Sequence, residues 1–369
     1  MCAFSEFRRR HSRHPGRAGL RGAFTLVEML VSIVILAAVL VLFSLMLGQA
    51  SKGWANGSSK SAQFREGRAA FASLVGRLSE ATLNPYNGYQ YTGVTTGTAT
   101  NYIPSRYYRR SELRFISGPG STVVGTSTSP TDAVFFLAPL GQVTDTASYG
   151  QLHGLLNICG YYVQWSNADP DRPPILPGSG IYRFRLMQFV EPSEAMVLYS
   201  KTSNYPTYSA VTTSPAWQQA AVAACPSTQV WSRPLANNVV ALLLLPALST
   251  TDVSGTLGYT YNSETYIAPT SVDTPNPQNR LPPVMRVVLY TIDEPSAQKI
   301  GGSSTMPNIY VSGTTTLFTD PTKLYPAADG SDIGDLIRFE NVLTKNGLNF
   351  RRLETAIQFA RAPWKTLMP

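Results

Sequence analysis

Charged residues and histidines are scarce in this sequence. Only 14% of the 369 residues are charged and three are histidines, of which His11 and His14 lie among the first 23 residues. The third, His153, has no GxSxG, HExxH or GxxxxGKS/T motif beside it, and a nucleophilic triad needs a base held by an orienting carboxylate. We therefore expect His153 to be a loop or strand-edge residue, and we predict that the chain is not an enzyme and needs no cofactor.

Cysteine is equally scarce. Cys2 lies near the start of the chain, and only Cys159 and Cys225 follow it. Three cysteines without a CxxC pair, in a chain with so few histidines, do not make a metal site. In an oxidising compartment Cys159 and Cys225 could form one disulfide. The alternative is that both are small buried apolar residues.

Acidic residues gather at one place, in the segment DGSDIGDLIRFE, which contains Asp329, Asp332 and Asp335. Calcium takes about 6–8 oxygen ligands, so these carboxylates are weak calcium candidates. The alternative is that Asp332 caps a short helix that begins near Ile333, with Asp335 in its first turn, where the helix dipole favours negative charge. We expect the cap and no metal.

The net charge of +8 comes mainly from one end of the chain. Residues 1–23 contain six arginines and one acid, a net charge of +5, whereas all other residues contribute only +3. A nucleic-acid surface needs basic residues gathered on the folded domain. One mixed group there consists of Tyr102, Arg106, Tyr107, Tyr108, Arg109, Arg110 and Arg114. We expect this group to be a solvated loop edge, and we expect no nucleic-acid partner.

Residues 24–49 are long and apolar enough to cross a membrane. They read FTLVEMLVSIVILAAVLVLFSLMLGQ, and residues 29–47 contain no charge and only two serines. About 20 such residues span the hydrocarbon core, whereas a signal peptide has about 7–15 apolar residues before a small-residue cleavage site. We therefore predict one transmembrane helix. Six arginines precede it and few basic residues closely follow it, which places residues 1–23 in the cytoplasm.

One carboxylate lies at the cytoplasmic edge of this apolar run. Glu28 ends the pattern GAFTLVE, residues 22–28. A charge at membrane depth is costly unless it is paired or close to an interface. If the chain is cut after Ala23, Phe24 gains a free amine four residues before Glu28. That ammonium, in the same subunit or in a neighbour, is the natural partner of the carboxylate.

This string resembles the class III signal of type IV pilins and pseudopilins, in which a basic leader precedes a small residue, Phe-Thr-Leu-x-Glu and an apolar span. The resemblance implies that a prepilin peptidase cuts after Ala23 and methylates Phe24, with Gly22 marking a second, less favoured cut. It also implies that Thr25 and Glu28 take part in filament assembly. The sequence departs from the usual pattern at one place, because Ala23 stands where the family usually has glycine.

Strings farther along the chain resemble a narrower group, the pilin-like Verru_Chthon cassette protein C. They are REGRAAFASLVGRLSEATLNPY, GYYVQW, YRFRLMQFVEPSE, LPPVMRVVLYTIDEPSA and NFRRLETAIQFARAPW, and with the signal they cover residues 22–365. This group is similar to the J-type minor pseudopilins of type II secretion. The resemblance implies an inner-membrane protein with a periplasmic domain, whose partners are other pseudopilins or pilins, a secretion platform and the lipid bilayer. A major pilin and a membrane-tethered periplasmic binding module remain as alternatives.

The sequence as a whole predicts an α+β, pilin-like fold. We expect a leader at 1–23 that is removed, a transmembrane helix at 24–49, and an amphipathic continuation at 50–84 that packs on a β-rich domain at 85–369. Apolar residues at helical spacing support the continuation; they are Phe64, Phe71, Leu74, Val75 and Leu78.

Turn and strand signals add detail to this prediction. Each glycine costs about 1 kcal/mol in a helix, so we expect a kink or melted stretch at Gly48, Gly53 and Gly57. Residues 94–101 and 200–215 are expected to be exposed loops. Runs rich in β-branched and aromatic residues predict five strands; they are 133–140, 158–165, 181–190, 238–248 and 283–292.

Overall fold

The computed structural model describes residues 25–96, 99–152, 154–167, 180–196, 217–223, 225, 231–248, 257–265, 276–327 and 329–359. Contacts divide the chain into two compact units, Met1–Gly57 and Ser58–Pro369, which we describe separately. The first unit contains an apolar helix and the second is rich in strands, so the chain is α+β, as predicted. The predicted leader and His153 lie outside the described residues.

Helix α1, Leu26–Ser79, is the longest element among the described residues and ends a few residues before residue 84, the expected end of the amphipathic continuation. Its helical structure continues through Gly48, Gly53 and Gly57, so the melted stretch predicted at these glycines does not occur. A helix that has nucleated gains one hydrogen bond for each residue added, and long helical sequences lie on both sides of the glycines. The boundary between the two units nevertheless falls at the third of them.

The strands of the second unit include all five that the sequence predicts. These five are β4 Asp132–Ala138, β5 Asn157–Asn167, β6 Tyr182–Glu191, β8 Val239–Ala247 and β10 Val284–Ile292. The other strands among the described residues are β1 Tyr86–Thr96, β2 Ala99–Arg110, β3 Phe115–Pro119, β7 Ser232–Asn237, β9 Tyr261–Asn262, β11 Val311–Ser312, β12 Thr315–Thr316 and β13 Phe350–Gln358. The loop predicted at 94–101 is wrong, because β1 and β2 pair there as an antiparallel ribbon. The loop predicted at 200–215 lies outside the described residues.

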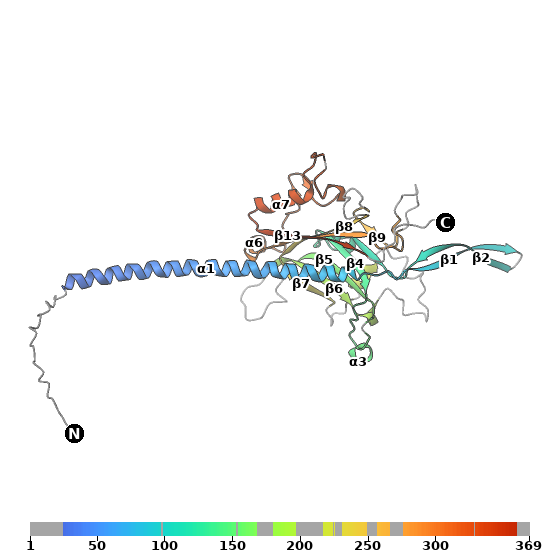
Figure 1. Ribbon diagram of the computed structural model, residues 1–369, viewed down its shortest axis with the longest axis horizontal. Coiled ribbons are helices and arrows are strands. Elements are labelled where there is room, and N and C mark those ends of the chain that lie inside the picture. Colours follow the sequence, from blue (N-terminus) through green and yellow to red (C-terminus); the bar gives the residue numbers. More distant parts are fainter. Residues whose placement is uncertain are drawn as a thin grey trace, which may run out of the picture. The chain divides into compact units, whose positions relative to one another are not determined.

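The second unit is built mainly from two antiparallel sheets (Figure 1). The larger has the strand order β7-β6-β5-β4-β3-β9, and the smaller has the order β13-β10-β8. In the middle of the larger sheet, Cys159 of β5 lies opposite Phe136 of β4 and Val190 of β6. Strands β1 and β2 form a separate ribbon, and β11 and β12 form a second one.

The two sheets are joined where β8 passes the start of β4. The N–H groups of Leu242 and Leu244 donate to Thr131 Oγ1 at 3.2 Å and to Asp132 Oδ2 at 2.7 Å. Strand β8 is the last strand of its sheet, so these two side-chain oxygens satisfy N–H groups that no further strand pairs. Asp132 is fully buried, and its burial raises the pKa of the carboxyl to about 7.

Short helices lie between the strands along the chain. They are α2 Gly120–Val123, α3 Thr146–Tyr149, η2 Ser193–Ala195, α5 Trp217–Ala223, α6 Glu294–Ile300, η3 Pro321–Lys323 and α7 Asp335–Lys345. Helix α7 packs on the smaller sheet, where Phe339 meets Tyr290 of β10 edge to face at 5.1 Å between ring centres. Helix α6 starts at Asp293, whose Oδ1 atom accepts the Ser296 N–H at 3.0 Å.

Candidate functional site

Thr25 and Glu28 hold the start of helix α1. The Glu28 N–H group lies 3.3 Å from Thr25 Oγ1 and 3.0 Å from the Thr25 carbonyl oxygen, and both oxygens accept it. Thr25 is therefore the N-cap, and residues 25–28 have the T-x-x-E spacing of a capping box. The sequence contained this signal for the cap, although we predicted for Thr25 only a part in assembly. The cap fixes where the first turn, and with it Glu28, begins.

The Glu28 carboxylate is exposed in that first turn, where the helix dipole favours negative charge. It is the sole charged residue between residues 26 and 51. Its predicted partner, the amine of Phe24, lies outside the described residues, as do Gly22 and Ala23 of the predicted cleavage site. The described part of the chain therefore presents one carboxylate at the end of a long apolar surface.

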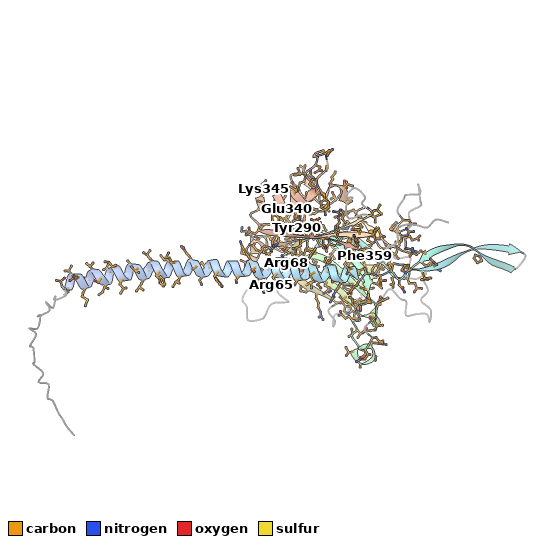
Figure 2. All side chains as sticks on the ribbon, viewed as in Figure 1. Arg65, Arg68, Tyr290, Glu340, Lys345 and Phe359 are labelled. Atoms are coloured by element: carbon orange, nitrogen blue, oxygen red, sulfur yellow. The ribbon has the colours of Figure 1, made fainter. Side chains whose placement is uncertain are left out.

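That surface belongs to the apolar segment, which we define as Leu26–Trp54. It is a helix of 29 residues, and its most apolar stretch of 18 residues has a mean hydropathy of 3.1 and no buried residue. The large apolar side chains of residues 26–47 are 48–81% exposed, and Figure 2 shows side chains standing out along this part of the ribbon. By length and composition this helix could cross a membrane, a property that signal sequences share.

Residues 58–79 of the same helix, here called the docked segment, lie against the β-rich domain. One stripe of the helix is buried at steps of three and four residues, and it consists of Gln63, Gly67, Ala70, Leu74 and Leu78. Leu74 and Leu78 are fully buried, in agreement with the predicted face. Phe64, Phe71 and Val75 are only partly buried, because each follows a residue of the stripe by one position and so lies at the edge of the buried face.

At Gly67 the helix lies close to strand β10. A Cβ atom at this position would lie 2.7 Å from Cγ2 of Thr291, the second-last residue of strand β10. Thr is branched at Cβ and stiff, so it cannot easily give way. The exposed side of the helix carries Arg65 and Arg68 instead, which are labelled in Figure 2.

Polar contacts fix the docked segment along its length. Gln63 Nε2 donates to the Asn237 carbonyl at 2.9 Å, and the Asn237 N–H donates to Glu66 Oε1 at 2.9 Å. Lys60 Nζ lies 3.3 Å from Asp293 Oδ2. Burial acts to raise the pKa of Asp293, but hydrogen bonds from Ser296, Asn349 and Lys60 outweigh it and hold this pKa below its usual value.

Cys159 and Cys225 form no disulfide among the described residues. Cys159 interacts with the Tyr161 hydroxyl and with Arg77 of the docked segment, whereas Cys225 lies close enough to affect Tyr162. Adjacent strand residues such as Tyr161 and Tyr162 point to opposite faces of a sheet, so the two thiols lie on opposite faces of β5. A disulfide needs Cβ atoms about 3.5–4.5 Å apart, and this arrangement argues against one.

The Asp329, Asp332 and Asp335 carboxylates are each used within the protein. Asp329 accepts Ser331, and Asp335 accepts the Phe318 N–H at 2.9 Å. The predicted cap needs correction: the N-cap of α7 is Gly334, with φ of 82°, and Asp332 accepts the Gly334 N–H at 2.8 Å just before the helix. Asp335 does lie in the first turn.

The arginine and tyrosine group is divided by the fold. All of its members except Arg114 lie on β2. Arg114 is buried and forms an ion pair with Glu264 at 2.5 Å, so the prediction of a solvated edge is wrong for this residue. Its guanidinium supports the fold of the domain and is not presented to a partner.

A cavity of about 410 Å³ opens just beyond the end of helix α1. Its lining consists of Ser79, Glu80, Ala81, Thr82, Asn84, Pro139, Leu156 and Phe359. Glu80 is the one ionisable residue in this lining, so no acid–base pair or nucleophile with its base lies there. The described residues also contain no group of three or more His, Cys, Asp or Glu side chains that could hold a metal ion.

Comparison with known proteins adds no relative: no protein family, no curated protein and no solved structure matches the chain. The features that distinguish the described residues are therefore the apolar segment with Glu28 at its start and the docked segment on the domain. Both belong to helix α1.

Proposed function

We propose that this chain is the precursor of a pilin-like subunit, a minor pseudopilin of a type II secretion-like or type IV pilus-like filament. One observation carries the proposal: Glu28 is presented in the first turn of a helix whose long apolar surface is not covered by any of the described residues. A subunit of this kind acts by assembly and not by catalysis. Its apolar segment is held by the bilayer before assembly and by neighbouring helices afterwards.

The basic leader and the GAFTLVE pattern complete the proposal. A prepilin peptidase would remove residues 1–23 at Ala23 and leave Phe24 with a free, methylated amine. The Thr25 cap starts the helix, with Glu28 in its first turn and four residues after Phe24 in the sequence. In a setting of low dielectric constant an ammonium and a carboxylate attract strongly. A subunit that enters the filament could then pair its amine with the Glu28 carboxylate of a neighbour, which would set the register of assembly.

The docked segment supports different roles for the two parts of helix α1 in the subunit: one part carries the domain and the other lies in the membrane or filament. Because Leu74 and Leu78 are fully buried against the domain, the domain moves with this part of the helix. The arginines before the apolar segment support an orientation with residues 1–23 in the cytoplasm and the domain outside it. The subunit would therefore be a single-pass inner-membrane protein with a periplasmic domain until it joins the filament.

The decisive experiment replaces Glu28 by valine in the native host. We expect the Glu28→Val protein to insert in the membrane and to be cut before Phe24, because the cleavage site is unchanged, but to lose crosslinks to partner pilin-like proteins and to fail in filament assembly. Ser32→Val, one turn farther along the same apolar surface, is the matched control and should assemble normally. Sheared filaments, envelope crosslinking and N-terminal mass spectrometry provide the readouts.

The other outcomes separate the alternatives. Normal crosslinking and normal function of the Glu28→Val protein would refute the assembly role and favour a membrane-tethered binding module. Loss of cleavage would show that Glu28 serves the peptidase instead. An intact residue Met1 in the mature protein would refute the pilin-like class altogether.

A further inference from the structure

Trp54 is the most exposed large hydrophobic side chain among the described residues beyond the uncharged run of helix α1. It is 82% exposed, and it is the last residue of the apolar segment. The sequence around it, SKGWANGSSK, is otherwise made of small and polar residues. A tryptophan fully in water would keep a large apolar surface hydrated, so its position calls for a partner.

The bilayer interface is the partner that fits an isolated tryptophan at the end of an apolar helix. Tryptophan is enriched at both membrane–water interfaces, where its ring lies at headgroup level. Lys52 lies two residues earlier, within about 3 Å of the same depth along the helix. Its ammonium group can reach lipid phosphates while its stem stays in the apolar layer.

The length of the segment agrees with this placement. Trp54 lies 26 residues after Glu28, which is about 39 Å along a helix. A bilayer is about 40–45 Å thick with its headgroups and about 30 Å thick in its hydrocarbon core. The uncharged residues 29–47 would fill that core. With these residues in the core, Glu28 lies at one edge of it, against the headgroup layer. Trp54 lies about 10 Å along the helix beyond Leu47 at the other edge, and its side chain leans back toward the helix N-terminus and so toward the headgroup layer.

We propose that Trp54, with Lys52, is a lipid-binding anchor at the membrane interface on the side of the β-rich domain. This anchor fixes the depth of the apolar segment and places Glu28 at the headgroup layer on the opposite side of the same bilayer. The inference rests on the membrane anchoring contained in the proposed function. It adds the binding residue, the lipid region that binds it, and a consequence for Glu28. At headgroup level the carboxylate stays in contact with water before assembly, so it is accessible to the amine of a neighbour.

Depth-dependent fluorescence quenching tests the proposal on the mature full-length protein. The protein is reconstituted in phosphatidylcholine–phosphatidylglycerol vesicles whose acyl chains carry bromine either close to the headgroup or deep in the chain. The difference in fluorescence between the unmodified protein and Trp54→Phe isolates the signal of Trp54 from those of the other tryptophans. A second protein carries Leu40→Trp in the Trp54→Phe background and serves as the mid-span reference.

We expect shallow bromine to quench Trp54 at least about two-fold more than deep bromine, and the opposite order for Leu40→Trp, which lies about 21 Å nearer the middle of the span. Equal quenching profiles at the two positions would overturn the anchor. Unquenched, water-like emission of Trp54 would also overturn it and would leave a protein partner for this side chain.

A flotation assay distinguishes this failure from failure of the proposed function. If the protein does not float with the vesicles, membrane anchoring itself is refuted. If the protein floats and Trp54 lacks shallow quenching, only the anchor is refuted.

Discussion

The apolar segment and the docked segment of helix α1 differ in what surrounds their side chains. Large apolar residues at positions 26–47 are 48–81% exposed, whereas Leu74 and Leu78 are 0% exposed. The docked segment is also tied to the domain by Lys60, Gln63 and Glu66. The apolar side chains of the docked segment are thus buried against the domain, whereas those of the apolar segment are not covered by any of the described residues. An exposed apolar surface of this size is typical of a membrane or protein contact.

The largest effect that tests this difference should come from Leu74→Ala. Removing a fully buried leucine side chain loses its burial and leaves a cavity, which costs about 2–5 kcal/mol of the free energy of unfolding. Denaturant unfolding of the detergent-solubilised protein, followed by the fluorescence of buried Trp165 and Trp231, measures it.

Leu42→Ala is the matched control in the other segment. Leu42 is 62% exposed, so its truncation should leave the unfolding of the domain unchanged. A loss of similar size in both variants would show that the apolar segment is part of the folded core and that the two segments do not differ.

Strands could be predicted from the sequence where a continuous run of apolar residues is enough to identify them. Strands β4 and β8 are buried along their whole length, and their uninterrupted apolar runs were recognised in the sequence. Strand β13 was missed as a strand because it is half exposed and contains Arg351, Arg352 and Glu354. Its pairing with β10 depends on a partner far away in the sequence.

The same limit applies to the candidate site. The start of helix α1 is determined by neighbouring residues, so the T-x-x-E spacing of a capping box indicates it in the sequence. The role of Gly67 is not local, because its need for a small residue comes from Thr291 on β10. The cap of α7 was misplaced because Asp332 also pairs with Arg338, at 2.8 Å, a contact that forms only when the helix has folded.

The two units also differ in the burial of a carboxyl group, and this difference predicts how stability depends on pH. Glu28 is exposed, whereas Asp132 is buried between the sheets, and burial raises the pKa of Asp132 from 3.8 to about 7. The folded protein therefore binds more protons than the unfolded chain between these values. Stability should fall as the pH rises from about 4 to about 7, by up to about 4 kcal/mol for this group, and then remain constant.

Asp132→Asn should remove this slope, because asparagine keeps an oxygen for the Leu244 N–H group and cannot ionise. The variant should be more stable than the unmodified protein at pH 8 and nearly equal to it at pH 4, as measured by denaturant unfolding at each pH. Asp320→Asn, at an exposed carboxylate, is the control and should keep the slope. An unchanged slope in Asp132→Asn would contradict the prediction.

The smallest effect expected, and the finest test of the comparison, uses one substitution at two glycines of the same helix. Gly67→Ala should cost about 1–3 kcal/mol in the unfolding of the domain, because its Cβ atom would meet Thr291 Cγ2 at 2.7 Å in a packed interior. Gly53→Ala should cost nothing, because no atom lies within 4 Å of its Cβ position, and alanine favours the helix by about 1 kcal/mol.

A second substitution shows whether contact with Thr291 is the cause of the loss. Thr291→Ser removes Cγ2, so the pair Gly67→Ala with Thr291→Ser should recover part of the stability lost by Gly67→Ala alone, beyond the sum of the two single effects. Denaturant unfolding of all four proteins gives this coupling. If the pair shows no coupling, the docked segment does not approach β10 at this glycine, and its difference from the apolar segment would rest on Leu74 and Leu78 alone.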